Sequence, residues 1–146
     1  MNEPNIETLN QLLQGEHMAI KGYETVMSTL ANNHLKTQLN GILEDHKRHA
    51  MEINDRIYKL GGDPKESTGV AGLMSDMKLK IEGIVRNDKI MLKELYKGEE
   101  MGVSSVKEII KGDLDRGSLE MVEEILKTDE RHLMTLDQLI KEQENK

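Results

Sequence analysis

The chain has 146 residues, of which 36% are hydrophobic, so it is long enough for one domain with a single core. Its net charge of −7 argues against a surface for nucleic acid or for an anionic membrane, since both require clustered lysine and arginine. Because the chain has no cysteine, disulfides, thiolate zinc sites and iron–sulfur clusters are excluded.

The composition also favours helices over strands. Phe and Trp are absent, so Leu, Ile, Val and ten Met must fill the core, and Leu and Met are good helix formers. The N-terminal stretch MNEPNIETLN has neither a basic nor an apolar run, and no segment reaches the roughly 18 apolar residues of a membrane span. We therefore expect an all-α cytoplasmic domain over residues 1–146, with neither nucleic acid nor a membrane as a partner.

The first two predicted helices form a hairpin over about residues 3–60. Glu16 occupies a core position in the first helix, among apolar residues spaced by four and three: Leu9, Leu13, Ile20, Tyr23, Met27 and Leu30. After the break ANNH, His46 and His49 occupy core positions in a second run: Leu35, Leu39, Ile42, Ile53, Ile57 and Leu60. The stretch LGGDPKESTG then ends the hairpin, because glycine followed by proline is a helix stop.

A crossover over 61–87, with a short helix at 73–85, leads to a second hairpin over about 88–144. Asn87 is the predicted cap of the third helix, where Glu99 interrupts the core positions: Leu92, Tyr96, Val103, Val106 and Ile110. After KGDLDRGS, Asp129 and His132 interrupt those of the fourth: Val122, Ile125, Leu136, Leu139 and Ile140.

The two hairpins repeat one pattern at an offset of 83 residues. Glu16 aligns with Glu99, Tyr23 with Val106 and Met51 with Met134 at that single offset. The same offset places His46 over Asp129 and His49 over His132. Every polar residue in the core face of one hairpin therefore has a counterpart in the other.

These polar residues are predicted to meet midway along the bundle. Glu16 lies about fifteen residues before the turn at Asn32, and the two histidines lie about fifteen residues after it, so an antiparallel hairpin brings them to one depth. Buried carboxylates need a positive partner, and carboxylates with imidazoles suit iron, manganese or zinc. The predicted metal ligands are Glu16, His46, His49, Glu99, Asp129 and His132. The competing interpretation is a buried polar network without a metal.

Over roughly residues 6–142 the sequence resembles the ferritin-like superfamily of bacterioferritins and rubrerythrins. Its pattern is one Glu from each of two helices and Glu-x-x-His from each of the other two, around two metals. In this chain Glu16 and Glu99 match the single glutamates, and the bridging carboxylate on the fourth helix is matched by Asp129. The matching histidines are His49 and His132. The resemblance implies a ferritin-like four-helix bundle of two repeated antiparallel hairpins.

The resemblance also implies two irons per chain that oxidise Fe(II) with oxygen or peroxide, as in small stress-protection proteins of bacteria. Tyr23 resembles the tyrosine beside the bacterioferritin iron site, a proton or electron donor. Haem is not expected, because Lys47 stands at the position of the bacterioferritin Met ligand. His46 departs from the pattern where a second bridging glutamate is expected, and the neighbouring Asp45 points about 100° away from it around the helix. A single metal or an asymmetric pair therefore stays open beside the two-iron site.

Two further alternatives concern partners and activity. Gly15, Met18 and Gly22, and their repeat counterparts Gly98, Met101 and Ser105, form a strip of small residues and Met away from the metal ligands. This strip suits either a homodimer interface or packing against the crossover. The rival to a metal-dependent oxidase is a non-catalytic stress, interaction or metal-sensing bundle, held by a structural metal or by the buried network.

Overall fold

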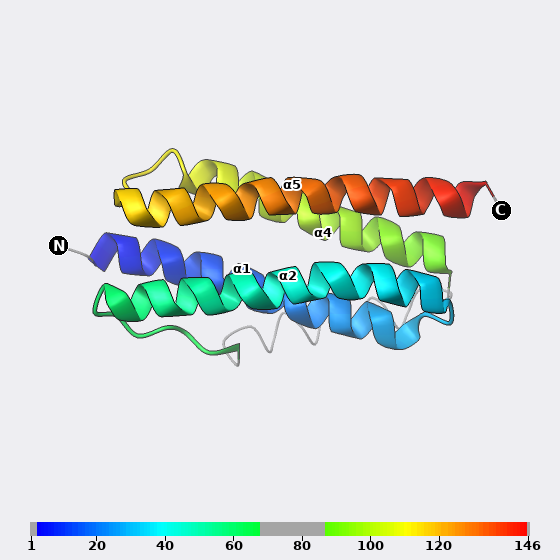
Figure 1. The fold of residues 1–146 in the computed structure, drawn as a ribbon, viewed down its shortest axis with the longest axis horizontal. Coiled ribbons are helices and arrows are strands. Elements are labelled where there is room, and N and C mark those ends of the chain that lie inside the picture. Colours follow the sequence, from blue (N-terminus) through cyan, green and yellow to red (C-terminus); the bar gives the residue numbers. More distant parts are fainter. Residues whose placement is uncertain (1–2, 68–86, 146) are drawn as a thin grey trace.

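The chain folds into a bundle of four long helices (Figure 1). The structure is a computed structural model that describes residues 3–67 and 87–145, so the predicted short helix at 73–85 lies outside the described residues. The helices are α1 (Glu3–Thr29), α2 (Asn33–Lys59), α4 (Asp88–Ile109) and α5 (Arg116–Glu144). Within the described ranges, no helix is both long and apolar enough to cross a membrane.

The helices pair as two antiparallel hairpins, α1 with α2 and α4 with α5 (Figure 1). The hairpins pack side by side, with α1 against α4 and α2 against α5. The turn between α1 and α2 lies at the end of the bundle where α5 finishes, and the turn between α4 and α5 lies at the end where α1 begins. The middle of each helix therefore lies at a similar depth, as the repeat predicts.

Local sequence chemistry sets the helix boundaries. The side chains of Asn32, Asn87 and Asp115 accept hydrogen bonds from backbone N–H groups in the first turns of α2, α4 and α5. Past the end of α2, Gly61 has a φ of 88°, a left-handed conformation that glycine adopts without steric cost. The predicted cap at Asn87 and the predicted glycine stop are both confirmed.

Two apolar clusters lie on either side of the bundle's middle. One contains Tyr23, Val26, Leu30, Leu35, Leu39, Ile42, Leu43, Met91, Leu92, Leu95, Leu136, Leu139 and Ile140. The other contains Leu9, Leu12, Leu13, Ile53, Ile57, Val106, Val122 and Ile125. Five predicted core residues are instead only half-buried against the clusters, at the margin of the apolar face: Ile20, Met27, Leu60, Tyr96 and Ile110. The two clusters enclose the level at which the polar residues were predicted to meet.

Arg56 joins the two hairpins at the end of the bundle where α5 begins. Its Nε donates to the Oγ of Ser118 at 3.0 Å, and its Nη2 donates to the carboxylate of Asp115. The backbone N–H of Asp115 in turn donates to the side chain of Asn5 at 3.0 Å. A Cβ at Gly117 would lie only 2.7 Å from Nη2 of Arg56, so glycine makes room for the guanidinium. These contacts connect α1, α2 and α5.

Candidate metal centre

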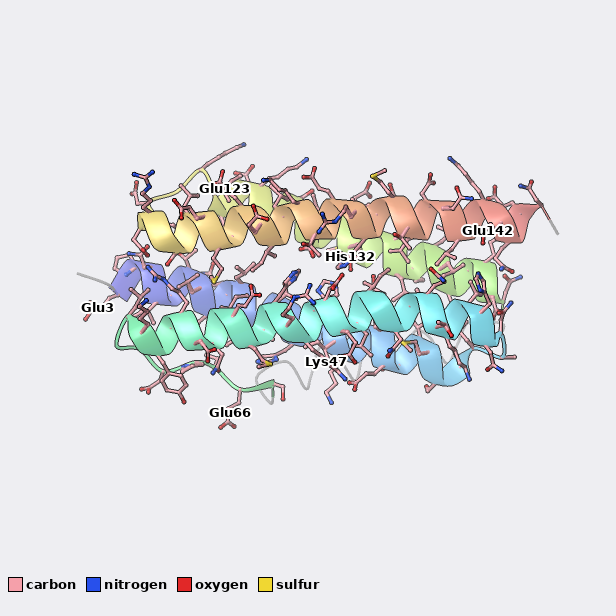
Figure 2. All side chains as sticks on the ribbon, in the orientation of Figure 1. Glu3, Lys47, Glu66, Glu123, His132 and Glu142 are labelled. Carbon is pink, nitrogen blue, oxygen red and sulfur yellow. The ribbon has the colours of Figure 1, made fainter. Side chains whose placement is uncertain are left out.

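Six polar side chains from all four helices are buried together midway along the bundle. None is more than 5% exposed: Glu16, His46, His49, Glu99, Asp129 and His132. Figure 2 shows His132 at this level, between α5 and α2. The structure thus brings together all six residues that the sequence predicted as metal ligands.

His46 lies between the two single glutamates. Its Nδ1 is 2.7 Å from Oε2 of Glu16, and its Nε2 is 2.5 Å from Oε1 of Glu99. Burial acts to lower the pKa of His46, but these hydrogen bonds raise it well above 6.5. The imidazolium therefore supplies positive charge to the carboxylates, whose repulsion would otherwise oppose folding.

Glu99 is the most heavily contacted carboxylate of the cluster. Besides His46, the hydroxyl of Tyr23 donates to its Oε1 at 2.7 Å. Burial alone would raise the pKa of Glu99, but His132 and His46 lower it to about 2. Burial and the negative charge of Glu99 raise the pKa of Tyr23 well above 10, so Tyr23 stays a protonated phenol beside an ionised carboxylate.

Asp45 contacts the cluster from α2, a role that the sequence did not reveal. The Nε2 of His132 donates to Oδ2 of Asp45 at 2.8 Å, and Nη2 of Arg48 donates to Oδ1 of the same carboxylate at 2.7 Å. Although burial opposes it, the carboxylates of Asp129, Glu99 and Asp45 raise the pKa of His132 to about 9. The Asp45 side chain thus reaches across to the other hairpin.

Three buried atoms of the cluster have no hydrogen-bond partner. They are Nδ1 of His49, Nδ1 of His132 and Oδ1 of Asp129. The Oδ1 of Asp129 lies 3.5 Å from the His132 nitrogen and 3.8 Å from the His49 nitrogen, so the three atoms face one another. Each unpaired buried polar atom costs about 1–3 kcal/mol, which a shared ligand would offset.

The donor set fits a metal ion. Ligand atoms within 4.8 Å of one another form two groups of four residues that share His46 and Asp129. One group adds Glu16 and His49, and the other adds Glu99 and His132. Burial, together with the charges of Glu16 and Glu99, raises the pKa of Asp129 although His132 acts against this, so the site disfavours a further negative charge without a cation. Imidazole and carboxylate donors suit iron, manganese or zinc.

Replacing Asp45 by alanine should weaken metal binding by roughly 10–100-fold, the usual effect of losing the partner of a ligating histidine. Without this carboxylate, His132 loses the hydrogen bond that directs its Nδ1 toward Glu99 and Asp129. Competition with a chelator of known affinity measures the change, and Asp55→Ala, at an exposed position on the same helix, is the control. Equal affinity in the two variants would show that Asp45 does not support a metal ligand.

The comparisons with known proteins give a family and a fold. The profile described as "Domain of unknown function (DUF2383)" matches residues 5–112, which is most of the chain. The chain belongs to this family. A sequence search of curated proteins found no significant match.

Solved structures show that this DUF2383 chain has a ferritin-like fold. A two-domain protein from Anabaena variabilis, with DJ-1/ThiJ/PfpI-like and ferritin-like domains, superposes with a TM-score of 0.84 at 16% identity. The match covers 97% of this chain and 40% of that protein, so the chain spans well under half of that relative's length.

Two other solved structures match this chain over a larger share of their own length than the two-domain protein does. A dodecameric thioferritin from Bacteroides fragilis has a TM-score of 0.79 at 19% identity, over 97% of this chain and 87% of that one. The bacterioferritin of Desulfovibrio desulfuricans has a TM-score of 0.77 at 22% identity, over 96% of this chain and 80% of that one. At such identities the similarity shows the fold alone, and it confirms the predicted ferritin-like bundle.

Proposed function

We propose that this chain binds iron in the buried cluster and oxidises Fe(II), with oxygen or peroxide as the electron acceptor, in protection against oxidative stress. The observation that carries the proposal is the set of three unpaired buried donor atoms on His49, Asp129 and His132, which face one another among carboxylates. The fold adds support, since the Desulfovibrio desulfuricans bacterioferritin is described with a diiron site in different catalytic states.

The side chains of the cluster suit such chemistry. His46, Glu99, Asp129 and His132 would hold the iron, and the bound iron would supply the redox chemistry. Overall, two Fe(II), one hydrogen peroxide and two protons would give two Fe(III) and two waters. Carboxylates favour the more highly charged Fe(III) product. The phenol of Tyr23 keeps its proton at rest, so its proposed role is to give up an electron and a proton together, with Glu99 as the hydrogen-bonded acceptor of the proton. The apolar clusters on either side limit the access of water.

The proposed number of ions rests on the family pattern and on the donor residues. The family pattern predicts two irons per chain, with a single ion as the alternative, because the two groups of ligand residues overlap at His46 and Asp129. Manganese or zinc would fit the same oxygen and nitrogen donors.

The rival function is a non-catalytic bundle held by its polar network, and one observation favours it. His46 already links Glu16 of α1 to Glu99 of α4, and its imidazolium offsets part of their charge. On this interpretation the cluster would hold three helices together without any metal. It leaves the unpaired atoms of His49, His132 and Asp129 unexplained.

The predicted homodimer also stays a proposal. On α4 the strip of small residues and Met is open, since Met101 is 66% exposed and Gly98 and Ser105 are exposed beside it. On α1 the strip is more covered, because Gly22 is buried and Met18 is half-buried. The α4 half is therefore the part that a second copy could reach.

Replacing His132 by alanine should abolish Fe(II) oxidation, and it tests the proposed function directly. The chain is loaded with Fe(II) without oxygen, freed of loose iron and then given peroxide or oxygen while Fe(III) formation is followed. The wild type should oxidise the iron it holds, whereas His132→Ala should not. His34→Ala, at an exposed position on α2, should behave as the wild type. Iron-free wild-type protein after loading would favour the non-catalytic bundle.

A further inference from the structure

We propose that the cluster holds one metal ion rather than two, and that Glu16 positions His46 instead of binding a second ion. The ligands in this arrangement are His46, Glu99, Asp129 and His132. His49 is not among them, and its Nδ1 lies 3.5 Å from Oε1 of Glu16. The inference rests on the proposed metal binding and deepens it, because it names the residue that sets the number of ions.

An imidazole cannot bridge two metal ions as a carboxylate can. A carboxylate has lone pairs on two oxygens, so it can bind both ions of a pair about 3.5–4 Å apart. A neutral imidazole has a lone pair on one nitrogen and a hydrogen on the other. His46 stands at the bridging position of the second helix, and it can therefore serve only one ion.

Two carboxylates orient two histidines toward the same oxygen of Glu99. The Nδ1 of His46 donates to Glu16, which leaves its Nε2 at 2.5 Å from Oε1 of Glu99. The Nε2 of His132 donates to Asp45, which leaves its Nδ1 at 3.5 Å from the same Oε1. Glu16 thus accepts a hydrogen bond from His46 in the same way that Asp45 accepts one from His132. Such partners fix the orientation of ligating histidines.

The part of the cluster around His49 lacks a carboxylate that plays the part of Asp45. The residue that corresponds to Asp45 at the repeat offset is Thr128, whose hydroxyl donates to the backbone carbonyl of Glu124 at 3.2 Å. The Nδ1 of His49 lies 3.5 Å from Oε1 of Glu16, whose other oxygen accepts from His46. For a second ion, the structure provides no carboxylate that orients His49 through its Nε2 among the described residues, and the Glu16 carboxylate already accepts from His46.

The test is the number of metal ions per chain in the wild type and two variants. Each chain is loaded with Mn(II), freed of loose metal and measured by elemental analysis and by electron paramagnetic resonance. The wild type should hold one ion with the spectrum of an isolated Mn(II). His46→Glu restores a bridging carboxylate, so it should hold two ions with the spectrum of a coupled pair. His34→Glu, at an exposed position, is the control and should hold one.

Glu16→Gln keeps the inference testable even if His46→Glu fails to fold. If Glu16 only positions His46, this variant should keep one ion and bind it roughly 10–100-fold more weakly. Two ions in the wild type, falling to one in Glu16→Gln, would overturn the one-metal arrangement and leave the proposed function standing. A wild-type chain that takes up no Mn(II) and no Fe(II) would overturn both.

Discussion

Replacing Glu99 by alanine should remove metal binding from this chain. Glu99 belongs to the group of ligand residues that His132 completes, and its Oε1 lies within 3.5 Å of nitrogens of both His46 and His132. Removal of a direct ligand should cost more than the roughly 10–100-fold that follows the loss of a residue that only orients a ligand. We therefore expect affinity to fall by more than about 100-fold.

The measurement is iron per chain after anaerobic loading, with Glu100→Ala as the control. Glu100 is the exposed neighbour of Glu99 on α4, so its loss should leave the iron content unchanged. Glu99→Gln keeps the size of the side chain and should also lose iron, which separates loss of the carboxylate from creation of a cavity. If the cluster is only a polar network, both Glu99 variants should change stability and leave no difference in iron content.

Much of this site could be predicted from sequence because polar residues break an apolar period. The core face of a packed helix is normally apolar, so a charged Glu16 or Glu99 in a core position indicates a special role. The same exception occurs in both hairpins, at an offset of 83 residues. Antiparallel pairing then fixes the depth of each residue within a hairpin. The two helical hairpins and the meeting of the six residues followed from these two facts, and the ferritin-like bundle was implied by the family resemblance.

The contacts between the hairpins could not be predicted in the same way. Asp45 lies off the core face of α2, and its contact with His132 depends on which helices are neighbours and how they are rotated. The direction of the His46 ring, with one nitrogen toward each glutamate, likewise depends on the packing of α1 against α4. Helical periodicity describes one helix at a time, so it predicts neither the contact of Asp45 with His132 nor the direction of the His46 ring.

Stripped of metal by a chelator, the chain should lose stability as the pH rises from 6.5 through about 9. Burial opposes the charged form of His132, but Asp129, Glu99 and Asp45 raise its pKa from 6.5 to about 9. A group with a raised pKa in the folded state stabilises the fold fully below its unfolded value and loses that contribution above its folded value. For His132 the shift corresponds to roughly 3 kcal/mol, and His46, whose pKa is also raised, acts in the same direction.

Metal binding should reverse this trend, because histidine nitrogens must lose their protons to become ligands. The stabilisation by added Mn(II) should therefore grow as the pH rises through the same range. Urea unfolding followed by circular dichroism, with and without metal, measures both curves. In metal-free His132→Asn, whose side chain at position 132 cannot titrate, the loss of stability between pH 6.5 and about 9 should be smaller than in the wild type. A metal-free wild type whose stability is flat or rises from pH 6.5 to about 9 would show that the buried imidazoles are not held as cations by Glu16, Glu99 and Asp45.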